Sequence, residues 1–206
     1  MMPSRKSQLA VNSRVVLMAG FGGLLLLMAF SGLDSIQALG HIQTANDEIR
    51  DEFLRRTRVL ERIRGDLYIS GTYVRDYLLE PESGKAEGHR YSLLESRRDM
   101  DAAVAEYRTL VNVQEETPFR GLTRELADYW SVLEPVLQWD PAQRRAHGYL
   151  FLRDEVFPRR QSMLGIADQI GELNGAQLSA GKAKVEASFR QSRRRLGLTI
   201  AVAIGL

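Results

Sequence analysis

Apolar residues recur at helical spacing through the first part of the chain. Between Leu39 and Tyr77, twelve successive positions alternate steps of three and four residues, and nine of them are apolar or aromatic. This heptad repeat is typical of a helix that buries one stripe against other helices. It predicts one long helix that ends near Glu80, because Pro81 and Gly84 then introduce a turn.

Two shorter helices are expected next. The second is predicted over roughly 85–116, with apolar residues on one face. The segment ETPFRG, residues 116–121, contains a proline and a glycine and is predicted to end this helix. The third helix is predicted to carry its apolar residues from Leu122 to Val136.

A fourth helix is predicted from Asp140 to the C-terminus. Asp140 is placed to cap its first turn, and Pro141 suits the first helical position, where an amide N–H is not needed. Pro158 lies inside this helix and is expected to kink it, because the proline ring displaces the carbonyl four residues earlier.

Two uncharged stretches lie outside the amphipathic helices. Residues 15–33 are long enough to cross a membrane, since a spanning helix needs about 20 apolar residues. Residues 196–206 are predicted to be the start of a second transmembrane helix that is truncated. A cleaved signal peptide is the alternative for the first stretch.

The charges beside these stretches predict an orientation. Arg5, Lys6 and Arg14 precede the first stretch, so the positive-inside rule puts residues 1–14 in the cytoplasm and residues 34–195 outside. Four arginines within 190–195 then lie on the outer side, against the rule. The rule is weak for long intervening domains, and arginine side chains can reach lipid headgroups from a helix end.

Amphipathic helices cannot stay single in water, because each must bury its apolar stripe. The sequence therefore predicts an all-α fold. Residues 34–195 are expected to form an antiparallel up-down-up-down four-helix bundle whose first and fourth helices are continuous with transmembrane helices.

Composition excludes several classes of function. The chain has no cysteine, so disulfides, thiolate metal sites and a cysteine nucleophile are excluded. All 26 acidic residues and 25 of the 28 basic residues lie within 34–195, so that region has no basic excess for nucleic-acid binding. The three histidines lack metal-binding spacing, and no nucleophile or phosphate-loop motif is present. We therefore expect no enzymatic activity, no metal, no cofactor and no nucleic-acid partner.

Two segments carry a resemblance to a known family. Residues 64–82, RGDLYISGTYVRDYLLEPE, and 152–178, LRDEVFPRRQSMLGIADQIGELNGAQL, lie on the two long helices. Together with the order of spans and helices over 15–206, they resemble the four-helix-bundle sensing domain of bacterial chemoreceptors and sensor histidine kinases. Such receptors continue into a HAMP linker and a kinase or methyl-accepting output region, which is absent from this chain.

The resemblance implies a function, a cellular location and a partner. The chain is expected to be the sensing module of a bacterial transmembrane receptor, embedded in the inner membrane with its sensor domain in the periplasm. A homodimer is implied, and so is a small anionic or amino-acid-like ligand. The alternative is a membrane-anchored structural bundle that binds no ligand.

Candidate ligand-binding residues follow from aligning the two long helices antiparallel, with Leu33 level with Leu196. One slab of the distal third then holds several charged and aromatic side chains, and arginine there suits a carboxylate ligand. Gly65, Gly71 and Gly165 fall in the same layer and are expected to let the backbones approach closely. The alternative interpretation is surface salt bridges with ordinary bundle aromatics. The candidates in this slab are Asp66, Tyr68, Tyr73, Arg75, Arg153, Asp154 and Arg159.

A second group follows from the resemblance, because family ligand sites lie between the first helices of two subunits. It comprises Arg55, Arg56, Arg58 and Arg62, and Arg56 stands out because it interrupts the apolar seam. The dimer face is expected to include residues 49, 53 and 60, with Arg56 near its own copy.

The membrane-proximal end of the bundle is predicted to be loosely packed. Asn46, Gln177, Ala180 and Lys184 form a small, polar seam between the two long helices. Loose packing there would let the fourth helix slide against the first, by the 1–2 Å displacements known from switching proteins.

Overall fold

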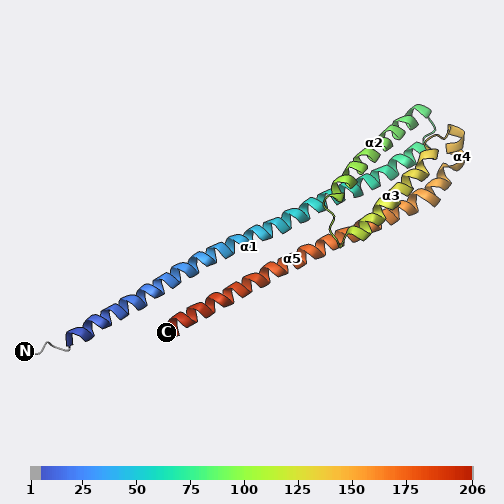
Figure 1. The fold of residues 1–206 in the computed structure, drawn as a ribbon. Coiled ribbons are helices and arrows are strands. Elements are labelled where there is room, and N and C mark those ends of the chain that lie inside the picture. Colours follow the sequence, from blue (N-terminus) through green and yellow to red (C-terminus); the bar gives the residue numbers. More distant parts are fainter. Residues whose placement is uncertain (1–5, 206) are drawn as a thin grey trace, which may run out of the picture. The chain divides into compact units, whose positions relative to one another are not determined.

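The computed structural model describes residues 6–205, and these residues contain helices and no strand (Figure 1). The predicted all-α class is confirmed. The chain divides into two compact units, one of residues Arg50–Ser179 and one of the residues up to Ile49 with those from Ala180. The helices are α1 (Lys6–Leu79), α2 (Ser83–Arg108), α3 (Glu116–Val136), α4 (Pro141–Phe151) and α5 (Phe157–Gly205), with a π-helical segment η1 (Leu152–Val156) between α4 and α5.

The first helix ends where the sequence predicts, just before Pro81. Proline has no amide N–H, so the carbonyl of Tyr77 lacks its helical donor. Arg144 of α4 supplies one, donating from Nη1 to the Tyr77 carbonyl at 2.8 Å and to the Glu80 carbonyl at 3.2 Å. Its guanidinium lies over the Tyr77 ring, 5.1 Å from the centroid, and the residue is only 4% exposed. A buried cation thus satisfies the negative end of the α1 dipole.

The boundary between the second and third helices differs from the prediction. α2 ends at Arg108, and the segment ETPFRG forms the start of α3 instead of ending the second helix. Asn112 explains the earlier end, because its side-chain oxygen accepts hydrogen bonds from the backbone N–H groups of Gln114 and Glu115 and so closes a turn. Pro118 lies in the first turn of α3, where its missing N–H costs nothing.

The start of the fourth helical segment is confirmed. Asp140 accepts hydrogen bonds from the backbone N–H groups of Ala142 and Gln143 at 2.8 Å, and the Gln143 side chain accepts from the Asp140 N–H at 2.9 Å. These reciprocal bonds form a capping box.

The segment is not one continuous α-helix as predicted. Before Pro158 the helix widens into η1, where the Phe157 N–H donates to the Leu152 carbonyl five residues earlier. Pro158 leaves the Asp154 carbonyl without its α-helical donor, so the irregularity falls in the turn that precedes the proline.

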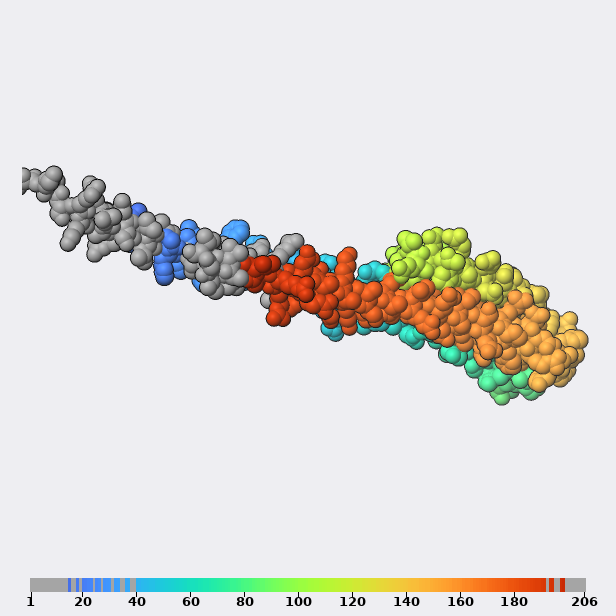
Figure 2. Space-filling view, turned by 90° about the horizontal axis from the view of Figure 1, so that it is seen from below, coloured from blue at the N-terminus to red at the C-terminus, as the bar shows by residue number. Residues whose placement is uncertain are grey.

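One hydrophobic core lies in the unit Arg50–Ser179 and receives residues from α1, α2, α3, η1 and α5. Figure 1 shows α2 beside the C-terminal part of α1, and α3 beside α5. Figure 2 shows α5, in orange, at the surface between the yellow-green atoms of α3 and the teal-green atoms of α1. The largest fully buried side chains include Leu67, Leu93, Leu122, Tyr129 and Met163.

Side-chain contacts in this unit reveal how α1 lies against its neighbours. Contacts of α1 with α3 and the residue before it join Arg56 to Glu115, Ser70 to Tyr129 and Tyr77 to Val136, and each pair is 59 residues apart. A constant separation arises when two segments run in the same direction. Contacts of α1 with α5 change in separation, from 118 residues at Arg56 to 103 at Arg64, as antiparallel helices require.

The other unit contains the N-terminal part of α1 and the C-terminal part of α5. Within it, a Cβ atom on Gly181 would lie 3.1 Å from Cγ2 of Ile49, so these two helices are in contact there. Several apolar side chains of α1 in this unit are more than half exposed, namely Val15, Met18, Phe21, Leu25, Leu26, Met28, Phe30, Leu33 and Ile36.

Two stretches of this unit are the predicted spans. In the described part of the chain, no helix is both long enough and apolar enough to traverse a bilayer. Several side chains of 15–33, and most of those of 196–206 together with Leu206 itself, lie outside the described residues.

Candidate functional site

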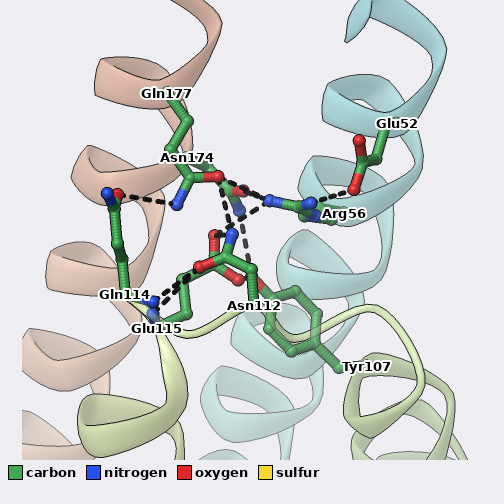
Figure 3. Close-up of polar contacts among 8 residues, drawn as sticks. All are labelled: Glu52, Arg56, Tyr107, Asn112, Gln114, Glu115, Asn174 and Gln177. Atoms are coloured by element: carbon green, nitrogen blue, oxygen red, sulfur yellow. Dashed lines mark hydrogen bonds and ion pairs between the residues drawn. The ribbon is translucent and has the colours of Figure 1, made fainter. Parts of the chain in front are cut away.

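A buried polar cluster surrounds Arg56 inside the unit Arg50–Ser179 (Figure 3). Arg56 is only 7% exposed although it carries a full charge. Its Nη1 donates to Gln177 Oε1 at 2.7 Å, to Glu115 Oε1 at 3.3 Å and to Asn174 Oδ1 at 3.4 Å, and its Nη2 pairs with Glu52. We call the cluster the Arg56 hub; it comprises Glu52, Arg56, Tyr107, Asn112, Gln114, Glu115, Asn174 and Gln177.

The charge that balances Arg56 in the interior belongs to Glu115, whose side chain is fully buried. Besides the Arg56 bond, its carboxylate accepts hydrogen bonds from Asn112 Nδ2 at 3.0 Å and from the Tyr107 hydroxyl at 3.2 Å. Glu115 is also the residue directly before α3, where a negative charge interacts favourably with the helix dipole. A buried carboxylate with this many donors is stable only while they remain in place.

The Tyr107 hydroxyl connects α2 to α5. It donates to Glu115 and accepts from Asn174 Nδ2 at 3.0 Å. Burial raises the pKa of Tyr107 well above its usual value, and the negative charge of Glu115 raises it further. The phenol therefore stays protonated and keeps its donor role.

The segment between α2 and α3 is tied to α5 by amide side chains. Asn112 Nδ2 donates to Gln177 Oε1 at 2.6 Å, and Gln177 Nε2 donates to Gln114 Oε1 at 3.1 Å. Figure 3 shows Asn112, Gln114 and Glu115 gathered next to Arg56 and Gln177. The hub thus joins α1, the α2–α3 connection and α5 at one level of the unit.

The charged slab residues Arg75, Arg153, Asp154 and Arg159 form ion pairs with residues one to four positions away in the sequence. Arg75 pairs with the adjacent Asp76 at 2.7 Å, Arg153 pairs with the adjacent Asp154 at 2.6 Å, and Arg159 pairs with Glu155 of η1 at 3.0 Å. These pairs are local and largely solvent-exposed, which is the arrangement of the alternative interpretation, surface salt bridges.

The other predicted residues are also distributed over different surroundings. Tyr68 is 58% exposed, whereas Tyr73 packs against the core. Arg62 is half-exposed and pairs with Glu106 of α2 at 2.9 Å. Asp66 is partly buried near Asp99 and Arg62.

The expectation that three glycines bring the helix backbones together is wrong. A Cβ on Gly71 would lie 2.9 Å from Cδ of Arg160 and closer still to its Nη1, so Gly71 makes room for an arginine side chain. Added Cβ atoms on Gly65 and Gly165 would meet nothing within 4 Å.

The expected position of Arg56 near a second copy of the chain also needs correction. Arg56 points into its own unit, and Leu60, named as part of the same dimer face, is 1% exposed in the core. The apolar seam of α1 packs within its own chain, because it shares one hydrophobic core with residues of α2, α3 and α5.

Two adjoining cavities lie between α2 and α3, with volumes of about 420 and 340 Å³, and both are lined by Arg108 and Thr123. Beside the second cavity, the Arg97 guanidinium lies 5.2 Å from the centroid of the Trp130 ring. None of the predicted ligand-binding residues lines either cavity.

Sequence reasoning identified Arg56 but missed most of its partners. Asn174 interrupts the apolar spacing of α5 as Arg56 does in α1, so the same signal was available for it. Glu115 and Asn112 lie between helices, where periodicity carries no information. Tyr107 was assigned to an apolar face, and only its hydroxyl belongs to the hub.

Asp66 gives a prediction for the pH dependence of stability. Partial burial raises its pKa above the ordinary value of 3.8; nearby Asp99 raises it further, and Arg62 opposes the shift. A carboxyl group whose pKa is raised by folding destabilises the fold above that raised pKa, and the penalty disappears below pH 3.8, where both states are protonated. Asp66→Asn should therefore raise the melting temperature at neutral pH and leave it unchanged below pH 3.8. A lower melting temperature at neutral pH would contradict this.

Comparison of the chain with protein-family models, with curated proteins and with solved structures finds no match.

Proposed function

We propose that this chain is the extracytoplasmic sensing module of a bacterial transmembrane signalling receptor, of the chemoreceptor or sensor histidine kinase type. In this proposal residues 15–33 cross the inner membrane and residues 34–195 form an antiparallel up-down-up-down bundle in the periplasm. Residues 196–206 begin the second span.

The observation that carries the proposal is the exposed apolar surface at the N-terminal part of α1. Nine large apolar side chains between Val15 and Ile36 are more than half exposed. So many neighbouring apolar side chains are unfavourable in water and are compatible with a lipid environment. α1 is one helix from Lys6 to Leu79, and its C-terminal part belongs to the unit Arg50–Ser179. In this proposal a change of packing in that unit is transmitted along α1.

The ligand and the dimer are parts of the same proposal. A small anionic or amino-acid-like molecule would favour one packing of the helices and shift the population toward it. A parallel homodimer would bring two copies of α1 together through its exposed side chains, which in the unit Arg50–Ser179 include Leu54, Tyr68 and Ile69.

One observation favours the alternative, a membrane-anchored structural bundle without a ligand. The most buried charged cluster, the Arg56 hub, is occupied by its own hydrogen bonds, and the slab proposed for the ligand carries local surface ion pairs. A bundle whose buried charges pair with its own side chains is also what a purely structural role requires.

Topology is tested by fusing alkaline phosphatase after Gly88, near the N-terminus of α2. This enzyme becomes active only outside the cytoplasm. We expect an active fusion in cells, because the charges around 15–33 direct the following region outward. The matched control carries β-galactosidase at the same residue and should be inactive. An inactive phosphatase fusion of normal abundance, with an active β-galactosidase fusion, would overturn the proposed topology.

Ligand binding is tested separately on the full chain in detergent. A panel of carboxylates and amino acids is scored by thermal shift, since a ligand at about 100 times its Kd stabilises the folded state by about 2.7 kcal/mol. A shift with one class of compound supports the sensing module. No shift with any compound, together with the expected topology, supports the structural alternative.

A further inference from the structure

The surface of α5 near the hub is made largely of small side chains. Between residues 171 and 183 it carries glycine, alanine and serine at most positions. A Cβ on Gly175 would meet nothing within 4 Å, whereas α1 side chains pack on the other two glycines: an added Cβ would lie 3.6 Å from Leu60 at Gly171 and 3.1 Å from Ile49 at Gly181. α5 itself therefore offers few large side chains to interlock with α1 over this stretch. Apolar packing of such a surface changes little when the helix moves along its neighbour by one turn, because large interlocking side chains are what specify a register.

The hub responds differently to the same movement. Asn174 and Gln177 of α5 make its bonds to Arg56, Tyr107, Asn112 and Gln114. A movement of α5 by four residues, about 6 Å, would bring Ile170 and Leu173 to these two places, or Leu178 and Gly181 in the other direction. Either way Arg56, Tyr107, Asn112 and Gln114 would lose these bonds, because none of the incoming residues has a side chain that can hydrogen-bond.

We propose that the Arg56 hub, more than the small-residue packing beside it, fixes the register of α5 against α1. A buried polar group at an otherwise apolar seam is the best-attested way to select one register among several of similar packing energy. α5 can then slide along α1 only when the hub opens and the contacts of Arg64 with Ala167 and Asp168 break. The hub is thus the buried part of a conformational lock built into the fold. This inference depends on neither the membrane nor a ligand.

Cysteine crosslinking tests the register directly, because the chain has no cysteine of its own. Ile49→Cys with Gly181→Cys reports the register of the structure, where these two residues are in contact. Ile49→Cys with Val185→Cys reports a shift of one turn in one direction, and Ala45→Cys with Gly181→Cys reports a shift in the other. In the full parent chain we expect rapid oxidation of the first pair and slow oxidation of the shifted pairs.

The hub is then removed by Arg56→Met with Glu115→Met, which eliminates both charges and leaves neither one stranded. We expect the crosslinking rate of at least one shifted pair to rise about tenfold, because the register preference is lost. The matched control is Arg144→Met, which removes another buried arginine that contacts only the end of α1. This control should leave the crosslinking pattern unchanged.

Two outcomes would overturn the proposal. One is a folded double variant that keeps the crosslinking pattern of the parent. The other concerns Gln177→Met, which removes the two shortest hub bonds to α5 without changing the charge and is used if the double variant does not fold. A smaller rise in a shifted pair is expected in Gln177→Met, and no rise would contradict the lock.

Discussion

Glu115→Leu should destabilise the unit Arg50–Ser179 by about 3–5 kcal/mol, the usual effect of removing one partner of a buried ion pair. The substitution leaves Arg56 charged and buried at 7% exposure, and the Tyr107 hydroxyl and Asn112 amide lose their acceptor. The loss is measured by urea unfolding of the full chain, followed by the fluorescence of Trp130 and Trp139, which both lie in this unit.

A matched control is available at the next residue. Glu116 is exposed and pairs with Arg120 on the surface, so Glu116→Leu should change the stability by less than about 1 kcal/mol. Arg56→Met combined with Glu115→Leu should recover most of the loss, because no unpaired charge is then buried. A double variant as unstable as Glu115→Leu alone would show that the cost does not come from a stranded charge.

Arg144→Met should destabilise the same unit by about 2–4 kcal/mol. It removes two hydrogen bonds from a charged donor, to the Tyr77 carbonyl at 2.8 Å and to the Glu80 carbonyl at 3.2 Å. A hydrogen bond to a charged group contributes about 1.5–3 kcal/mol, and the longer of these two contributes less than the shorter. Methionine fills similar space but cannot donate, so the Tyr77 carbonyl, which Pro81 already deprives of its helical donor, stays buried without a partner. The effect is measured by the same unfolding experiment.

Arg145→Met is the control for this substitution, because Arg145 is the exposed neighbour on α4. We expect it to change the stability by less than about 0.5 kcal/mol. Equal effects of the two substitutions would mean that loss of positive charge near the end of α1, and not the two buried hydrogen bonds, is responsible.

The sequence by itself determined the helices and several of their ends. The three-and-four spacing of apolar residues sets the long first helix, because a stripe that must be buried is visible wherever it repeats. Pro81 ends α1 and Asp140 caps α4 through local chemistry, which acts over a few residues and needs no tertiary partner.

Local sequence signals were insufficient where one residue type suits two different structures. Pro118 was interpreted as a helix breaker, but proline is equally suited to the first turn of a helix. Only the turn that Asn112 closes, which the tertiary contact with Gln177 supports, decides that α2 ends at Arg108.

The tertiary structure alone decided which charges meet. Arg56 was recognisable from the sequence as a polar interruption of an apolar seam, yet its direction was not, because a seam residue can face a second copy or its own bundle equally well. Glu115 lies 59 residues away between two helices, and Gln177 lies 121 residues away. Periodicity places residues on a face of one helix, whereas the pairing of buried charges depends on how several helices and their connections come together in space.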